Sequence, residues 1–114
     1  MLDRTTYVVN EGSFEREVLM HSRPVVVSFT SRTCPACAAL EPEYERATRM
    51  DYSGVKFVRV MLQDSAELFN RHRITATPTL LLFRGGVEVS RQVGAVTAEQ
   101  LLSWLNQQAA KAAA

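Results

Sequence analysis

The chain has 114 residues, of which 46% are hydrophobic and 22% charged, proportions that are ordinary for one globular domain with a single core. The 13 basic and 12 acidic residues leave a formal net charge of +1, so no basic surface for nucleic acid and no charged tail is indicated. The apolar runs are far shorter than the roughly 20 residues of a membrane span. We therefore expect a single domain over residues 1–114 that binds neither nucleic acid nor a membrane.

The first part of the chain predicts a strand, a helix and a second strand. Residues 5–9 are mostly β-branched or aromatic, which favours a short strand. Ser13 can cap a helix that carries Phe14 and Val18 on one side. Residues 25–30 are almost entirely apolar, a pattern typical of a strand that is covered on both faces in a parallel sheet.

The middle of the chain predicts a long helix, a strand and a short helix. Residues 36–50 have helical composition, and we expect Pro42 to kink this helix. Residues 55–62 predict a strand. Asp64 and Glu67 have the spacing of a capping box, which would open the short helix.

The last part predicts a hairpin and a C-terminal helix. Pro78 introduces the apolar strand 79–83, and a two-glycine turn connects it to the strand 87–93. Thr97 and Gln100 form a second possible capping box, followed by an amphipathic helix. Strands and helices alternate early and a hairpin follows late, so we expect an α/β protein with a mixed sheet and helices on both faces.

Both cysteines of the chain stand in the motif CPAC, as Cys34 and Cys37. Such a pair can form a reversible disulfide, supply half of a metal site, or fill a core with two small side chains. A metal needs four ligands. The two histidines, His21 and His72, are each isolated among polar residues, and such a histidine is usually a solvated surface residue. We therefore predict no metal site within one chain, while a cluster shared between two chains remains an alternative.

The position of the motif before a helix suggests redox chemistry. With Cys34 as the helix N-cap, Pro35 takes the first helical position, where its missing N–H costs nothing. The Cys34 sulfur then faces the free N–H groups of Ala36 and Cys37 and the positive end of the helix dipole, which lowers the pKa of its thiol. Cys37 lies on the same side of the helix, close enough for a disulfide. The hypothesis is thiol–disulfide exchange in which Cys34 attacks and Cys37 resolves the mixed disulfide.

Several stretches, spread over residues 5–107, resemble the thioredoxin family. They are SFEREVL with PVVVSF, the CPAC motif with Pro42 five residues after it, ITATPTLLLFRGG, and VGAVTAEQLLSWL. The resemblance implies a thioredoxin fold, with a central mixed β-sheet between helices. It also implies a monomeric oxidoreductase that acts on protein disulfides without a bound cofactor and is recycled by a reductase or an oxidant.

The resemblance also assigns residues to a substrate site. It implies a cis peptide bond between Thr77 and Pro78, beside the cysteines, with the Thr77 backbone available to an extended substrate. A strand that merely begins at Pro78 is the alternative. Gly94 matches a glycine that leaves room for substrate. The predicted substrate-binding residues are Thr33, Pro35, Ala36, Thr77, Pro78 and Gly94.

The sequence departs from the family beside the second cysteine. Thioredoxins bury an aspartate six residues before the first cysteine and pair it with a lysine; these positions are Ser28 and Arg59 here. In the family the carboxylate helps to move the proton of the buried cysteine, which neither a serine nor an arginine does at neutral pH. Glu41 is a candidate to act through water, and a solvated helix-face glutamate is the alternative. For Arg59, a strand-end position reaching solvent and a role favouring thiolate are both open.

Two further departures bear on the function. Thr33 replaces the tryptophan that usually precedes the first cysteine, so the docking surface is less apolar. The Pro-Ala dipeptide replaces Gly-Pro and predicts a somewhat more oxidising couple. Two functions are therefore alternatives to a reductant of protein disulfides. One is a redox-switched interaction module with little catalysis, and the other is an oxidase or isomerase.

The beginning of the chain bears on localisation. It contains acidic residues and lacks a continuous apolar segment, unlike a signal peptide. We therefore expect a cytoplasmic protein. An exported protein, of which this sequence is a part, is the alternative.

Overall fold

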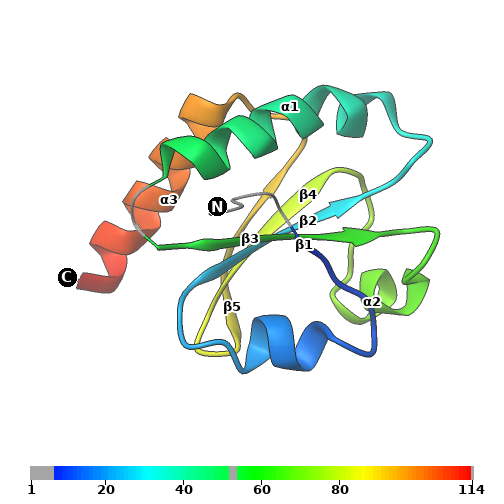
Figure 1. The fold of residues 1–114 in the computed structure, drawn as a ribbon, viewed down its shortest axis with the longest axis horizontal. Helices are drawn as coiled ribbons and strands as arrows, with labels where there is room; N and C mark the ends of the chain where they lie inside the picture. Colours follow the sequence, from blue (N-terminus) through cyan, green and yellow to red (C-terminus); the bar gives the residue numbers. More distant parts are fainter. Residues whose placement is uncertain (1–6, 52–53, 114) are drawn as a thin grey trace, which may run out of the picture.

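A computed structural model describes residues 7–51 and 54–113. A five-stranded sheet with the order β1-β3-β2-β4-β5 lies at the centre (Figure 1). Its strands are β1 (Tyr7–Val8), β2 (Val25–Thr30), β3 (Lys56–Met61), β4 (Thr79–Arg84) and β5 (Val87–Val93). β1 and β2 run parallel to β3, whereas β4 is antiparallel to both β2 and β5. The expected mixed sheet is confirmed.

Helices cover both faces of the sheet, as expected (Figure 1). They are the π-helix η1 (Glu15–Leu19), α1 (Pro35–Met50), α2 (Ala66–Arg71) and α3 (Ala98–Ala113). α1 and α3 lie on one face, and η1 and α2 on the other. α1 is continuous through Pro42. Of the predicted first strand, residues 5 and 6 lie outside the described residues. Within the described part of the chain, no helix is long and apolar enough to cross a membrane.

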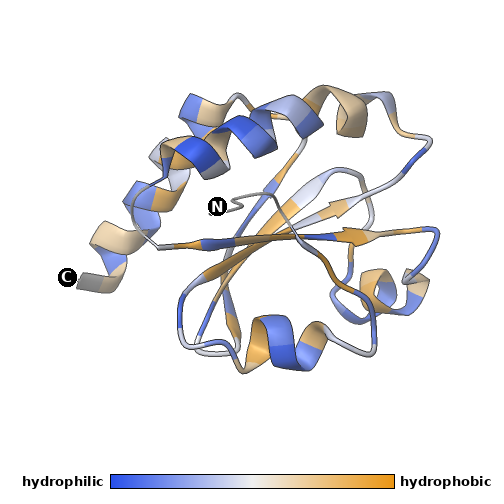
Figure 2. Cartoon of the chain, viewed as in Figure 1, coloured by the Kyte–Doolittle hydropathy of each residue, from blue (hydrophilic) through white to orange (hydrophobic). Residues whose placement is uncertain are grey.

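The pattern of burial explains the positions of the strands. All six residues of β2 are buried, because β2 lies between β3 and β4 and has helices over both of its faces. β5 lies at the edge, and its side chains alternate between exposed and half-buried. In Figure 2 hydrophobic residues run along the central strands, and the helices alternate between hydrophobic and hydrophilic residues.

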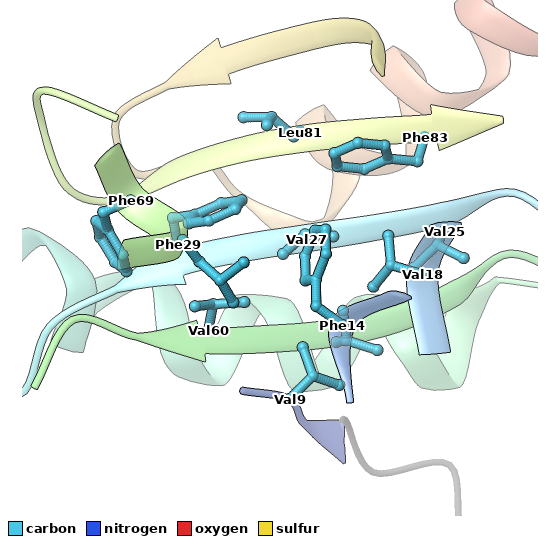
Figure 3. Packing of buried hydrophobic residues seen from close by; sticks show 12 residues of the cluster. Val9, Phe14, Val18, Val25, Val27, Phe29, Val60, Phe69, Leu81 and Phe83 are labelled. Atoms are coloured by element: carbon cyan, nitrogen blue, oxygen red, sulfur yellow. The ribbon is translucent and has the colours of Figure 1, made fainter. Parts of the chain in front are cut away.

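Two clusters of apolar side chains form the core, one on each face of the sheet. The cluster on the η1 and α2 face includes Phe14, Phe29, Phe69 and Phe83, and Figure 3 shows its side chains gathered between the strands and these two helices. The cluster on the α1 and α3 face contains, among others, Leu40, Tyr44, Leu80, Leu101 and Trp104. The second cluster holds α1, and with it the CPAC motif, against the sheet.

Tyr44 fixes α1 on the backbone of two strands. Its side chain is fully buried, at 0% exposure, and its hydroxyl proton is shared between the carbonyl oxygens of Val26 at 3.0 Å and Val58 at 2.8 Å. Burial is the main cause that raises the pKa of Tyr44 well above its usual value. The phenol therefore remains a neutral donor to β2 and β3.

One of the predicted helix caps is confirmed. The Thr97 N–H donates to Gln100 Oε1 at 2.9 Å, and the Gln100 N–H donates to Thr97 Oγ1 at 3.1 Å. This reciprocal pair is the capping box expected at the start of α3.

The other two predicted caps are wrong. The Ser13 carbonyl accepts the first helical bond, from the Glu17 N–H at 2.8 Å, but its hydroxyl turns back to Asn10 and bonds no helical N–H. At α2 the N-cap is Ser65, which makes no side-chain cap bond. Asp64 instead accepts from Arg32 Nη2 at 2.9 Å. In both places the side chain bonds another polar residue instead of an N–H group of the helix.

Candidate active site

Cys34 is the N-cap of α1, as predicted. Its Sγ accepts a hydrogen bond from the Cys37 N–H at 3.2 Å, and Pro35 occupies the first helical position. Cys34 is half-buried among the exposed residues Thr33, Pro35 and Ala36. Cys37 is only 1% exposed. The two thiols therefore differ in access: Cys34 can meet a partner at the surface, whereas Cys37 meets only what has reached Cys34.

The pKa of the Cys34 thiol is lowered from its usual value. The largest cause is a hydrogen bond from the Cys37 side chain, followed by one from the Thr77 side chain. Burial comes next and raises the pKa, while the backbone N–H groups of Cys37 and Ala36 lower it further. One contact acts in the opposite sense, because the protonated Cys34 Sγ also donates to the Thr77 carbonyl oxygen at 3.4 Å and loses that bond on ionisation. The donors to sulfur outnumber this contact, so the thiolate is favoured.

The segment before β4 lies directly beside Cys34. The Thr77–Pro78 peptide bond is cis, as the resemblance implied, and Pro78 is buried. The Gly94 N–H donates to the Pro78 carbonyl at 2.8 Å, which joins the end of β5 to this segment. Gly94 has φ +101°, and a Cβ built there would meet nothing within 4 Å. The positive φ favours glycine, and the open space in front of it is available to another chain.

Arg91 holds the same segment from the β5 side. Its Nη2 donates to the His72 carbonyl at 2.9 Å and its Nη1 to the Arg73 carbonyl at 3.3 Å. Glu88 orients the guanidinium, with Arg91 Nε donating at 2.7 Å. Arg91 of β5 and Gly94, the residue after β5, are therefore bonded to the two ends of the connection between α2 and β4.

A polar network that the sequence analysis missed holds the loop before Cys34. Ser31 Oγ accepts from Gln63 Nε2 at 2.8 Å and from the Thr33 N–H at 3.3 Å, while Gln63 Oε1 accepts from the Arg32 N–H at 3.2 Å. Ser31 follows β2 and Gln63 follows β3. Because the carboxyl ends of parallel strands meet at one edge of a sheet, polar residues just after both strands were the available signal.

A cleft of about 420 Å³ opens on the α1 side of the sheet. Both cysteines line it, together with Arg32, Glu41 and Arg59. Arg59 lies inside β3, and its side chain is 15% exposed. Its Nε is 3.0 Å from Glu41 Oε2, and its Nη2 is 3.1 Å from Glu45 Oε2. Arg59 therefore does not lie at a strand end, and its largely buried guanidinium is paired with two glutamates at the cleft. A role of Arg59 in favouring the thiolate stays a prediction.

Ser28 is buried at the position where the family has its buried aspartate, and Glu41 lies at the cleft. Ser28 is opposite Arg59 in the sheet register, 0% exposed, and its Oγ has no hydrogen-bond partner among the described residues. Glu41 is ion-paired with Arg59 and lines the cleft, so it is not simply a solvated glutamate on an outer helix face. The charged groups in the place of the family's Asp–Lys pair are thus Arg59 and two glutamates of α1.

The described ranges 7–51 and 54–113 contain no group of three or more His, Cys, Asp or Glu side chains placed to hold a metal ion. The cysteines are free thiols. What the geometry offers is a half-buried thiolate, a buried second thiol and a neighbouring cis-proline segment. Together these are the parts of a thiol–disulfide exchange site.

The fold and the site place the protein in the class of thiol–disulfide oxidoreductases. A family model described as Thioredoxin matches residues 5–107, and the chain belongs to the thioredoxin family. It is 32% identical over 98 residues to a thioredoxin of Rickettsia bellii, covering 86% of this chain and 93% of that protein. It is 31% identical over 98 residues to a thioredoxin of Pyropia yezoensis, with 86% and 92% covered. A Nostoc protein named thioredoxin 1 is 31% identical over 88 residues, with 77% and 82% covered.

His72 makes the stability of the fold depend on pH. Its ring centroid lies 5.1 Å from that of Phe14, 5.8 Å from Phe29 and 5.6 Å from Phe83. Its Nε2 is buried and has no hydrogen-bond partner among the described residues. Burial, followed by the charge of Arg71, lowers the pKa of His72 below its usual value, and Glu88 opposes this effect. The folded state therefore favours a neutral ring. The expectation of a solvated surface residue is wrong for His72, because its ring packs against three phenylalanines.

We expect the free energy of unfolding to fall as the pH drops below about 6.5, the pKa of histidine in an unfolded chain. Below that pH the unfolded chain binds more protons than the folded chain, so acid favours unfolding. His72→Leu, which keeps an apolar side chain among the three phenylalanines, should remove this part of the decline. Urea titrations of both proteins at pH 7.5 and 5.5 measure it. An equally steep decline in the variant would mean that other groups cause it.

Proposed function

We propose that the protein reduces disulfide bonds of other proteins, with Cys34 as the attacking and Cys37 as the resolving thiol. The observation that carries the proposal is the Cys34 sulfur, which is half-buried at the start of α1 and accepts the Cys37 N–H at 3.2 Å. A sulfur in this position is ionised more easily than a free thiol and is open to a large partner. Membership of the thioredoxin family supports the same reaction.

The proposed reaction has two steps. The Cys34 thiolate attacks one sulfur of a substrate disulfide; a bond between Cys34 and that sulfur forms, the substrate disulfide breaks, and the second substrate sulfur leaves as a thiolate. Cys37 then loses its proton and attacks Cys34 Sγ, which releases the first substrate sulfur and leaves a Cys34–Cys37 disulfide. A separate reductase must return two electrons to this disulfide before the next cycle.

The backbone around the cis-proline supports an extended protein segment as the substrate. Thr77 precedes Pro78 at the start of β4, and the space in front of Gly94 is open. A chain that adds to a sheet edge gains main-chain hydrogen bonds whatever its side chains are. We further propose that the protein works as a monomer in the cytoplasm, since a free dithiol is kept reduced there.

Two measurements test the proposal. The protein should accelerate the reduction of insulin disulfides by dithiothreitol, followed by the precipitation of the insulin B chain. Its reduction potential, titrated in glutathione buffers with thiol alkylation, should lie somewhat above the ~−270 mV of thioredoxin and remain closer to that value than to the ~−120 mV of a strong oxidant. A potential close to ~−120 mV would instead favour an oxidase. Redox-active thiols without any turnover would favour an interaction module.

A further inference from the structure

Cys37 has to lose a proton inside the protein. Its side chain is 1% exposed, and it must become a thiolate before it can attack the mixed disulfide on Cys34. Ser28, which lies on the sheet face that α1 covers, has a buried hydroxyl that is not a base at neutral pH. Arg59 stays protonated and cannot accept a proton either. Another group must take the proton.

Among the described residues that line the cleft beside Cys37, Glu41 is the one carboxylate. It follows Cys37 by four residues on α1, and residues at this spacing lie next to each other on one side of a helix. The cleft of about 420 Å³ is large enough for several water molecules, each of which takes about 30 Å³. Proton transfer from Cys37 to Glu41 through water is therefore sterically open.

Arg59 holds Glu41 at the cleft. The Arg59 Nε lies 3.0 Å from Glu41 Oε2, and its Nη2 lies 3.1 Å from Glu45 Oε2. Because Arg59 is 15% exposed and Glu41 is 39% exposed, the pair reaches from the protein interior to the cleft surface. Arg59 Nε makes no hydrogen bond with a described residue, so its contact with Glu41 is an ion pair, and the attraction between the two charges keeps the carboxylate at the cleft.

We propose that Glu41 accepts the proton of Cys37 during the resolving step and that Arg59 is the residue that positions Glu41. The Cys37 S–H bond breaks and its proton reaches a Glu41 carboxylate oxygen through water. The electron pair on Cys37 sulfur forms the bond to Cys34 Sγ, and the substrate sulfur leaves as a thiolate. Glu41 then releases the proton to solvent at the open side of the cleft. This inference rests on the resolving role of Cys37 in the proposed function.

Because of the charges around Glu41, the proposal predicts whether removal of this carboxylate makes resolution slower or faster. Arg59 faces Glu41 from β3, Arg32 faces the cleft from the loop before Cys34, and Glu45 lies on α1 itself. If Glu41 served only as a negative charge, its removal would leave the positive charge of Arg59 to favour the Cys37 thiolate, and resolution would become faster. If Glu41 is the proton acceptor, its removal makes resolution slower.

The experiment is a single-turnover reaction of the reduced protein with dipyridyl disulfide, a neutral probe whose two pyridine thiones are released one after the other. Attack by Cys34 releases the first, and attack by Cys37 releases the second. In Glu41→Gln we expect the second release to be about ten- to a hundredfold slower near pH 7, a loss that reaches at most the lower end of the ~10²–10⁴-fold range of general base catalysis. The pH profile of the second release should move to higher pH, and the difference from wild type should shrink as hydroxide replaces the missing carboxylate as the base.

The first release serves as the internal control, because an unchanged rate shows that Cys34 and the fold around it are intact. Glu45→Gln is the matched variant: it removes the other carboxylate bound to Arg59 and should leave the second release within about twofold of wild type, because the path through the cleft is intact. Arg59→Lys keeps the positive charge but loses the two-point hold, so we expect a slower second release. Combined with Glu41→Gln it should add no further loss, as expected for residues that act as a unit.

Several results would overturn the inference. A second release in Glu41→Gln that is as fast as or faster than wild type would show that Glu41 is not the acceptor. Additive effects of the Glu41 and Arg59 changes would show that Arg59 acts separately. If the wild type released no second thione at any pH, the resolving role of Cys37, and with it the proposed function, would fail as well.

Discussion

Replacing Cys34 by serine is expected to reduce disulfide exchange to the uncatalysed rate. The serine hydroxyl is not ionised at neutral pH and cannot attack a disulfide, although it can still cap α1 by accepting the Cys37 N–H. The loss therefore reports on the chemistry at sulfur and not on the helix. Insulin reduction and the first thione release from dipyridyl disulfide both measure it. A Cys34→Ser protein that retained turnover would exclude the proposed nucleophile.

Replacing Cys37 by serine should have a different outcome. Cys34 remains and can still attack, but nothing resolves the product, so a mixed disulfide with the substrate should accumulate. The adduct is detected by mass spectrometry and should disappear on addition of dithiothreitol. The double variant Cys34→Ser/Cys37→Ser is the control and should trap nothing. If both single variants formed adducts equally well, the buried position of Cys37 would not separate the two roles.

The largest loss of stability is expected for Phe29→Ala. Phe29 is 0% exposed on β2, and its ring lies 5.2 Å from that of Phe69 in an edge-to-face arrangement (Figure 3). Deleting a buried phenyl ring leaves a cavity among rigid neighbours and typically costs ~3–5 kcal/mol. We expect the urea midpoint to fall by roughly 1 M or more while the slope m stays constant.

Val93→Ala is the control for this prediction. Val93 lies on the edge strand β5 and is 62% exposed, so its truncation should change the free energy of unfolding by no more than about 0.5 kcal/mol. A cost for Phe29→Ala below about 1 kcal/mol would mean that the core collapses around the missing ring. A change in m would indicate that the denatured state, rather than the packing, had been altered.

The sequence was sufficient for the features that depend on local pattern. A nearly uninterrupted apolar run identified β2, since a strand covered on both faces has no polar side to display. The Pro-led CPAC motif placed Cys34 at a helix start, because proline at the first helical position and a capping side chain before it act within one turn. The cis bond at Pro78 followed from family resemblance alone, as its prior in folded proteins is only about 5–6%.

The remaining features depend on contacts between distant segments. The ion pairs of Arg59 with Glu41 and Glu45 require the register of β3 against α1, which no local pattern contains. Gln63 meets Ser31 only because two parallel strands end together. Asp64 had a plausible local partner and a distant one, Arg32, and the distant ion pair prevailed. Polar side chains with alternative partners are therefore where prediction from the sequence was weakest.

The hydrogen bonds of Tyr44 have a consequence for how freely this protein can change. The hydroxyl binds the backbone oxygens of Val26 and Val58, and every amino acid carries the same oxygen. Substitution of either valine can alter packing but cannot remove the acceptor. Substitutions at Val26 and Val58 therefore leave intact the hydrogen bonds that fix α1, the helix that carries the cysteines, to β2 and β3. The charged groups around Cys37 can accordingly be exchanged by design while the position of the dithiol is preserved.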